Sequence, residues 1–378
     1  MPEFPQGSTI LDYVAEGKWQ KDWSTESEAR NVLNKLGITD HEEKIDHLSG
    51  GQKKRVALAR TLVNPCDVLL LDEESPVRLR KACKNPTELE EERRAHVKDG
   101  AALCRFLYWL KHRVGKEPIT ECSAAEKLEQ LRKEQPGYLG PSFETIAAYG
   151  AHGAIVHHAP TPETDIPLEP KGLFLVDSGG QYLAATTDVT RTVALGPVTE
   201  REREMFTLVL RSHLALGAVQ FREGCRGDGL DVVARGPLWE RGLDFNHGTG
   251  HGVGYILSVH EGPQSFRLRS ADGRRITLEE GMVISNEPGY YEAGKFGIRH
   301  ENLVLVRNGD KTEFGQFMYL EPLTMVPFDR DAIDVALLTE PELALLNVPF
   351  VCCTYTNAYG TLDPSKYSSV SIADEQEA

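Results

Sequence analysis

Hydrophobic residues recur at helical spacing in several parts of the chain. A helix would carry Leu103, Phe106, Leu107 and Leu110 on one face, because they follow one another at intervals of three or one. Capping-box patterns, in which Ser or Thr precedes Glu by three positions, predict the starts of three helices. These pairs are Thr87 with Glu90, Ser123 with Glu126, and Thr199 with Glu202.

Continuous apolar runs occur between and after these predicted helices. The runs at 172–177 (GLFLVD) and 302–306 (NLVLV) are typical of buried strands. Strands mixed with amphipathic helices predict an α+β domain. The amphipathic helices are interpreted as elements that pack on a core, not as membrane or partner helices.

Composition narrows the class of protein. The 378 residues include 42 basic and 57 acidic ones, a net charge of −15, which argues against non-specific binding to nucleic acid or to an anionic membrane. Seven cysteines without regular spacing suggest free thiols in a reducing compartment. No run approaches the roughly 20 apolar residues of a membrane span, and the first residues lack a secretory pattern, so a cytoplasmic location is expected.

Four acidic residues and one histidine are the strongest chemical signal. Oxygen-rich ligands suit Mn, Co or Fe better than a structural zinc site built from cysteines. With a bridging hydroxide, two divalent ions would bring four carboxylates within about one charge of neutrality, whereas one ion would leave them strongly anionic. The pattern therefore predicts a dinuclear metal site with hydrolytic chemistry. Its residues are Asp177, Asp188, His251, Glu287 and Glu301.

The spacing of these residues leaves alternatives open. Asp177 and Asp188 could meet on paired strands of a hairpin, although an Asp beside glycines is equally typical of a turn. His247 and His251 would share one face of a helix, but the glycines between them favour a strand or a loop.

Five stretches carry a family resemblance: VDSGGQY, TTDVTRT, HGTGHGVG, SNEPGYY and GIRHEN. Through them, residues 75–347 resemble the catalytic domain of the creatinase and aminopeptidase family, and most closely its cytosolic X-Pro aminopeptidases. The resemblance implies the α+β pita-bread fold, a curved antiparallel sheet covered by helices. It also implies that Asp177 binds one ion, that Asp188 and Glu301 bridge two ions, and that His251 and Glu287 hold the other. Manganese is the typical metal.

The same resemblance assigns catalytic roles around the metals. It implies that His247 and His260 hydrogen-bond the substrate carbonyl or the tetrahedral intermediate, and that His157 orients residues around the scissile bond. Tyr291 and Arg299 receive supporting roles. Arg299 lies two residues before Glu301, so on a strand it would point to the same face and could steady a ligating carboxylate. His158, which neighbours His157, is interpreted as a satisfied core polar residue.

The implied reaction removes an N-terminal residue from peptides with proline at the second position, through a hydroxide that bridges the metals. Proline needs a dedicated pocket because its amide has no N–H and its φ is fixed. A prolidase that cleaves X-Pro dipeptides is the nearest alternative, and a domain that only binds proline-containing peptides is another. The resemblance also allows for a homodimer.

The first 74 residues carry a different pattern. LSGGQKKRVALAR (48–60) and CDVLLLDEE (66–74) resemble the signature motif and Walker B strand of an ABC-type ATPase. In such a protein Ser49, Gly50 and Gly51 would face a phosphate, and Asp72 and Glu73 would serve magnesium and water. No GxxxxGK[ST] loop occurs in the sequence, so an ATP-binding ABC subunit is only an alternative function.

The ends of the chain are expected to contribute little to the catalytic domain. We interpret residues 1–74 as a truncated ABC-ATPase-like fragment joined to that domain, with little core of its own. Residues 348–378 are interpreted as a tail of unknown role.

Overall fold

The computed structural model describes residues 7–15, 23–48, 50–63, 76–256, 258–268 and 276–346. The chain divides into two compact units, Met1–Ser75 and Pro76–Ala378. Three features predicted from the sequence lie outside the described residues: Ser49, the Walker B segment with Asp72 and Glu73, and the tail from 348 onward.

The Met1–Ser75 unit is helical in its described part. Its elements are α1 (Ile10–Ala15), α2 (Trp23–Lys35), η1 (Ile45–His47) and α3 (Gly50–Val63). Ile10, Val14, Leu33 and Val56 are at most 1 % exposed and belong to one apolar cluster. The prediction that this segment has little core of its own is wrong, because its helices pack on one another and need no sheet.

The helices of the Pro76–Ala378 unit begin close to where the sequence places them. Thr199 caps α7 with Glu202 as predicted. The other two predicted caps are wrong by two or three residues. Asn85, followed by Pro86, caps α5 with Glu88, and Thr120 caps α6 with Ser123. The helices are α4 (Pro76–Ala82), α5 (Pro86–Arg113), α6 (Glu121–Lys133), α7 (Glu200–Gly217), α8 (Gly227–Trp239) and α9 (Glu340–Leu346).

Two antiparallel sheets dominate this unit. One has the strand order β2-β3-β6 and the other the order β10-β13-β14-β7. Both predicted strands are present, as β3 and β13. The strands are β1 (Tyr138–Pro141), β2 (Ile146–Tyr149), β3 (Leu173–Ser178), β4 (Gly180–Tyr182), β5 (Ala185–Thr186), β6 (Val189–Ala194), β7 (Gln220–Arg222), β8 (Gly250–His251), β9 (Ser265–Phe266), β10 (Val283–Asn286), β11 (Gly289–Glu292), β12 (Phe296–Arg299), β13 (Asn302–Thr312) and β14 (Gly315–Pro322). The unit also contains three short 3-10 helices: η2 (Gly150–Ala154), η3 (Arg330–Ala332) and η4 (Val335–Leu337).

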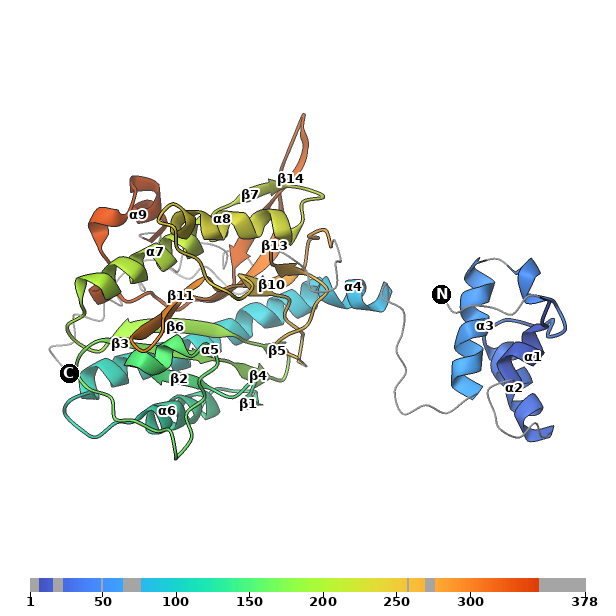
Figure 1. Ribbon diagram of the computed structural model, residues 1–378, viewed down its shortest axis with the longest axis horizontal. Coiled ribbons are helices and arrows are strands. Elements are labelled where there is room, and N and C mark those ends of the chain that lie inside the picture. The colour runs from blue at the N-terminus through green and yellow to red at the C-terminus, as the bar shows by residue number, and fades with distance from the viewer. Residues whose placement is uncertain are drawn as a thin grey trace. The chain divides into compact units, whose positions relative to one another are not determined.

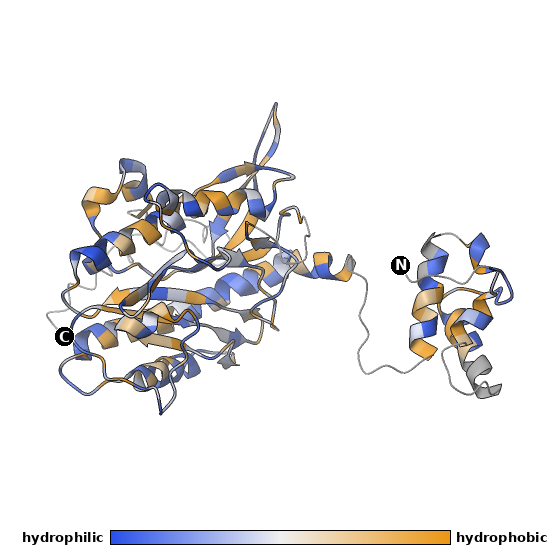
Figure 2. Cartoon of the chain, viewed as in Figure 1, coloured by the Kyte–Doolittle hydropathy of each residue, from blue (hydrophilic) through white to orange (hydrophobic). Residues whose placement is uncertain are grey.

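Helices cover the sheets and bury their apolar faces. α5 and α6 lie along the β2-β3-β6 sheet, whereas α7 and α8 lie side by side elsewhere on the unit (Figure 1). The predicted face of α5 is buried, since Leu103, Phe106, Leu107 and Leu110 all pack in the core beside Phe174 of β3. Hydrophobic and hydrophilic residues alternate along these helices (Figure 2). The amphipathic helices therefore serve as packing elements.

Two backbone segments approach each other closely beside this core. A Cβ on Gly297 of β12 would lie 1.8 Å from the carbonyl oxygen of Gly153, and one on Gly153 would lie 2.9 Å from the Gly297 nitrogen. Only glycine fits at either position. The contact holds η2 against β12.

Among the described residues, no helix is both long enough and apolar enough to cross a lipid bilayer.

Candidate metal centre

The five residues of the predicted metal site come from separate segments that the fold brings together. Asp177 lies in β3 and is paired in register with Thr190 of β6, and Asp188 directly precedes β6. His251 ends β8. Glu287 follows β10, and Glu301 lies between β12 and β13.

Three of the five side chains form a tight group. Single ligand atoms of Asp188, His251 and Glu301 all lie within 4.8 Å of one another. His251 Nε2 lies 3.3 Å from Asp188 Oδ2 and 3.5 Å from Glu287 Oε1, which adds the fourth residue to the group. Asp188 and Glu301 are nearly fully buried.

Asp177 has a different environment. Its Oδ2 accepts a hydrogen bond from Arg299 Nη2 at 2.5 Å. Its buried Oδ1 has no hydrogen-bond partner among the described residues. A buried carboxylate oxygen without a donor is costly, and a metal ion is one group that can satisfy it.

Second contacts fix the orientation of the ligand-type side chains. His251 Nδ1 lies 3.0 Å from the carbonyl oxygen of Gly252, so Nδ1 carries the proton and Nε2 presents a lone pair to the acidic group. Thr190 Oγ1 donates to Glu301 Oε2 at 2.7 Å, and Ser285 Oγ donates to Glu287 Oε1 at 2.9 Å.

The backbone of Glu301 is anchored as well. Its N–H donates to the carbonyl oxygen of Thr190. The buried guanidinium of Arg191 donates to the Glu301 carbonyl oxygen at 2.6 Å and to Asn302 Oδ1 at 2.7 Å. Sequence reasoning missed Thr190, Arg191 and Ser285, although all three stand in the quoted stretches around the acidic residues.

Burial and mutual repulsion characterise the carboxylates. Burial raises the pKa of Asp188 well above its ordinary value, and the charges of Asp177 and Glu287 raise it further. Burial likewise raises the pKa of Glu301, with Asp188 the largest charge contribution, and the pKa of Glu287. Within the described residues, no lysine or arginine forms an ion pair with Asp188 or Glu301.

These observations fit divalent cations. Buried acidic groups without cationic partners hold a surplus of negative charge that bound ions would neutralise. Four carboxylates and one imidazole form the hard, oxygen-rich set that suits manganese or a similar ion. The site can therefore hold metal, and the orphaned oxygen of Asp177 points to a further ligand beyond the Asp188 group.

A hydrogen-bond chain adjoins the centre. Arg299 Nη1 donates to the hydroxyl oxygen of Tyr291 at 2.8 Å, and that hydroxyl lies 2.9 Å from His247 Nε2. The carbonyl oxygen of Gly248 lies 2.8 Å from His247 Nδ1, which makes Nδ1 the donor and Nε2 the acceptor from Tyr291.

In this hydrogen-bonded series, His247 and Tyr291 each have a defined protonation state. Burial lowers the pKa of His247 to about 4, so the ring is neutral near pH 7. Burial raises the pKa of Tyr291 to about 12. Both ring nitrogens of His247 are occupied, so one contact must break before this residue can donate to a substrate oxygen.

The other residues predicted from the sequence differ in exposure and contacts. His260 is exposed, and its ring meets that of His251 edge to face at a centroid distance of 4.1 Å. Although the residue is exposed, partial desolvation of its ring, and then the charge of His251, lower the pKa of His260 to about 4. His157 is exposed, whereas His158 is buried and contacts Glu121, as expected of a satisfied core residue. Arg299 contacts Asp177 and Thr190 directly, which agrees with the expectation that it steadies a ligand-type carboxylate.

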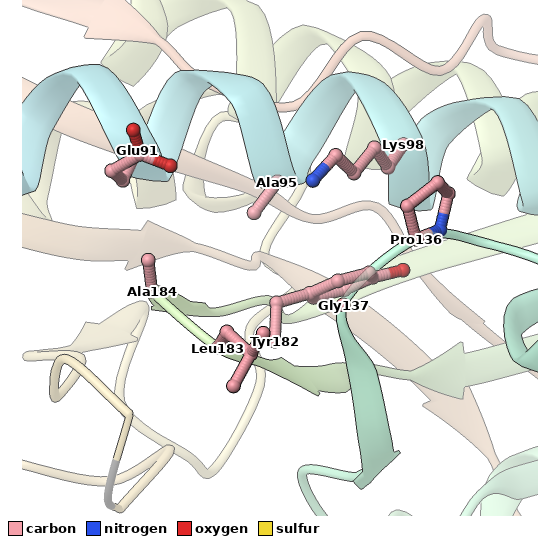
Figure 3. Close-up of a pocket in the computed structure, with 8 residues that line it drawn as sticks. All are labelled: Glu91, Ala95, Lys98, Pro136, Gly137, Tyr182, Leu183 and Ala184. Atoms are coloured by element: carbon pink, nitrogen blue, oxygen red, sulfur yellow. The ribbon is translucent and has the colours of Figure 1, made fainter.

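A pocket of about 300 Å³ lies elsewhere in this unit. Glu91, Ala95 and Lys98 of α5 form one wall, and Tyr182 to Ala184, from β4 and the turn after it, face them (Figure 3). Pro136 and Gly137 close one side. None of these residues belongs to the metal centre.

Comparison with known proteins decides the family. Residues 90–308, more than half of the chain, match the model for metallopeptidase family M24, and residues 316–348 match the model for the C-terminal region of peptidase M24. The chain belongs to metallopeptidase family M24. Residues 3–75 match a separate model, that of the ABC transporter family.

M24 relatives agree with this assignment. Aminopeptidase P2 of Arabidopsis thaliana is 46% identical over 288 residues, which cover 75% of this chain and 40% of that protein. The X-prolyl aminopeptidase from Caenorhabditis elegans, a cytosolic enzyme with a di-nuclear active site, matches with a TM-score of 0.68 and 38% identity, covering 72% of this chain and 44% of that one. The chain thus spans less than half the length of these relatives.

A prolidase from Pyrococcus furiosus shares the fold at lower similarity. Its TM-score is 0.55 and its identity 30%, and the match covers 66% of each chain. The matched M24 structures and the antiparallel sheets with covering helices confirm the predicted pita-bread fold and the predicted family.

Proposed function

We propose that the Pro76–Ala378 unit is the catalytic part of a metal-dependent X-Pro aminopeptidase. The convergence of Asp188, His251, Glu287 and Glu301, with Asp177 beside them, carries this proposal. Two bound divalent ions would supply Lewis-acid activation of a water and of the substrate carbonyl. The hard donor set supports manganese as the metal.

The residues of the chain itself would divide the remaining work. Asp177, Asp188, His251, Glu287 and Glu301 would hold the ions. Arg299 and Tyr291 would orient Asp177 and His247 through the hydrogen-bond chain. His157 and His260 are exposed beside this region and would meet the peptide, whose second residue would be proline.

The similarity of relatives supports an aminopeptidase over a dipeptidase. The relatives at 46% and 38% identity are aminopeptidases, whereas the prolidase is 30% identical. The nematode relative is described as a cytosolic enzyme, which supports a cytoplasmic location here. Association into a homodimer is part of the proposal only as an expectation from the resemblance.

Peptide cleavage by the purified chain tests the proposal. The chain is loaded with Mn²⁺ and given an X-Pro-X tripeptide, an X-Pro dipeptide and an X-Ala-X tripeptide. We expect release of the first residue from the X-Pro-X tripeptide, with less from the other two. Preference for the dipeptide would identify a prolidase. Binding without turnover would identify a peptide-binding module.

Two controls separate the proposed activity from alternatives. Asp188→Asn should remove turnover while the fold, followed by circular dichroism, is retained. ATP binding in the presence of Mg²⁺ tests the ABC-type alternative for residues 1–74. We expect no measurable binding, because no phosphate-binding GxxxxGK[ST] loop occurs in the sequence.

A further inference from the structure

A second cluster of ligand-type side chains lies apart from the five residues of the metal centre. Glu121, His152 and His158 each offer one ligand atom, and these atoms lie within 4.8 Å of one another. Glu121 is the first residue of α6, His152 lies in η2, and His158 follows that turn. Two of the three, Glu121 and His158, are buried, and His152 is one-quarter exposed.

One carboxylate oxygen is the focus of this cluster. Oε1 of Glu121 accepts the backbone N–H of Tyr149 at 2.6 Å. Oε2 lies 2.9 Å from His152 Nδ1 and 3.2 Å from His158 Nε2, and His152 Nδ1 also lies 3.1 Å from Oε1. The two rings lie beside each other at a centroid distance of 4.2 Å. Both imidazoles therefore converge on the carboxylate of a fully buried acid, and Oε2 is the oxygen that both contact.

The charge of Glu121 is not balanced by a permanent cation. Its ion-pair partners within the described residues are His152 and His158, which carry charge only when protonated. A divalent cation held by the three side chains would provide the missing charge.

The separations suit zinc. Zn²⁺ binds histidine nitrogen and carboxylate oxygen at about 2.0 to 2.2 Å, so tetrahedral ligands lie roughly 3.3 Å apart. The observed 2.9 and 3.2 Å need only small movements. Two imidazoles and one carboxylate are softer than the oxygen-rich metal centre and prefer zinc to manganese.

We propose that Glu121, His152 and His158 form a second metal site, selective for a zinc-type divalent ion. The exposed edge of His152 leaves an open position for water as the fourth ligand. A neutral imidazole that coordinates the ion keeps its ring proton, which moves to the nitrogen facing away from Glu121, whereas an imidazolium releases its second proton to solvent. This proposal does not rest on peptidase activity.

The position of the site couples it to the metal centre. His158 directly follows His157, and the carbonyl oxygen of Val156 accepts from Arg299 Nη2 at 3.4 Å. The same Arg299 nitrogen donates to Asp177. The Gly153 and Gly297 contact holds the turn with His152 against the strand that ends at Arg299. A zinc ion would brace this turn from its other side.

Metal stoichiometry of the full chain tests the proposal. The EDTA-stripped chain is equilibrated with micromolar Zn²⁺, separated from free metal by gel filtration and measured by mass spectrometry. We expect three equivalents for the unaltered chain and two for Glu121→Gln or for His152→Gln. Glu121→Gln retains an oxygen that can accept from Tyr149, which favours a preserved fold. His112→Gln is the matched control, since His112 is an exposed histidine whose ring stacks on Tyr108.

A second background removes the metal centre from the measurement. The variant Asp188→Asn/Glu301→Gln should retain one zinc equivalent, and adding His158→Gln should weaken that binding by more than about 100-fold. Retention of the same zinc content after Glu121→Gln and His152→Gln would overturn the proposal. Zinc binding by the Asp188→Asn/Glu301→Gln background that is unchanged on adding His158→Gln would overturn it as well, and these results are independent of peptide cleavage.

Discussion

Two regions of the Pro76–Ala378 unit bury acidic side chains, and they differ in how the negative charge is balanced. Asp99 of α5 accepts from Arg132 Nε at 2.8 Å and Nη2 at 3.0 Å, and also from the Tyr182 hydroxyl. Asp188 and Glu301 have no such cation within the described residues. The first region is neutralised by the protein itself, whereas the second would be neutralised by the metal ions proposed above.

The contrast explains why burial by itself does not identify a functional acid. Asp99 and Asp188 are both nearly inaccessible, but Asp99 is paired with Arg132, whereas the pKa of Asp188 is raised by burial and then by neighbouring carboxylates. Paired acids stabilise a fold, and crowded unpaired acids store unfavourable energy until a ligand arrives. Substituting residues in each region tests this difference.

The largest expected effect is on catalysis. Glu301→Gln removes one negative charge between the proposed ions, so metal content should fall and kcat/KM for an X-Pro-X tripeptide should drop at least about 1000-fold. Metal analysis and a peptide-release assay measure both. Glu134→Gln, on the exposed surface, should change neither. Full activity in Glu301→Gln would remove Glu301 from the centre.

The paired region should respond through stability instead. Asp99→Asn leaves the buried Arg132 without its counter-charge and should lower the free energy of unfolding by about 3 to 5 kcal/mol. Urea denaturation with EDTA and with Mn²⁺ measures this loss. We expect equal losses in both conditions, because Asp99 belongs to no metal site. A loss of stability confined to the Mn²⁺-loaded protein would show that Asp99 also depends on bound metal, which contradicts its description as an acid neutralised by Arg132.

Asp188→Asn should raise the free energy of unfolding of the metal-free protein, in contrast to Asp99→Asn, which lowers it. It relieves repulsion among buried carboxylates, so thermal denaturation in EDTA should occur at a higher temperature than for the unaltered chain. Added Mn²⁺ should stabilise the unaltered chain and leave the variant nearly unchanged. If Asp188→Asn is less stable than the unaltered chain in EDTA, the carboxylate is satisfied by the protein and the inference of bound ions fails.

The pH dependence should separate the metal-free from the loaded protein. A raised native pKa for Asp188, Glu287 and Glu301 means that the native state holds protons longer than the unfolded state. Their contribution is therefore present at low pH and lost as pH rises from the ordinary carboxyl values through the raised native ones. Glu92, whose pKa burial raises to about 8, adds the same trend in both forms.

Thermal denaturation between pH 6.5 and 8 isolates the cluster. Buried histidines such as His213, whose native pKa burial lowers to about 3, add a slope that is the same with and without Mn²⁺, so the difference between the two curves reports the cluster. Stability in EDTA should fall with rising pH more steeply than stability with Mn²⁺. Parallel curves would show that the three carboxylates do not bind the ion.

The smallest expected effect concerns the hydrogen-bond chain. Tyr291→Phe removes a hydroxyl that accepts from Arg299 and faces His247. One such bond contributes about 0.5 to 1.5 kcal/mol, so kcat should fall about 2- to 10-fold without loss of metal. Steady-state kinetics with metal analysis checks this. Loss of metal in Tyr291→Phe would mean that the residue supports the ligands and not the histidine.

Sequence reasoning located the family, the strands and the acidic residues because these depend on short local patterns. Thr199 with Glu202 was a correct helix start, whereas Thr87 and Ser123 were not caps. When several polar residues precede a helix, more than one of them can take the N-cap position, and the pattern alone does not decide which one does. Asn85 prevailed over Thr87 because Pro86 fits the first helical position behind it.

The contacts between distant segments could not be read from the sequence. The pairing of Arg299 with Asp177 joins residues 122 positions apart. The convergence of His152 and His158 on Glu121 likewise depends on how α6 packs beside η2. The core of Met1–Ser75 was underestimated because the sequence shows which residues are apolar but not that helices alone can bury them.

The facing glycines Gly153 and Gly297 make the geometry of the whole region vulnerable at two positions that take no part in chemistry. A methyl group on Gly297 would overlap the Gly153 carbonyl oxygen, and the strand leading to Arg299 would have to move outward. A single added carbon would thus shift the strand that ends at Arg299 while every ligand-type side chain of the metal centre stayed unaltered. In random mutagenesis, substitutions of these two glycines would therefore reduce function as strongly as substitutions of ligand residues.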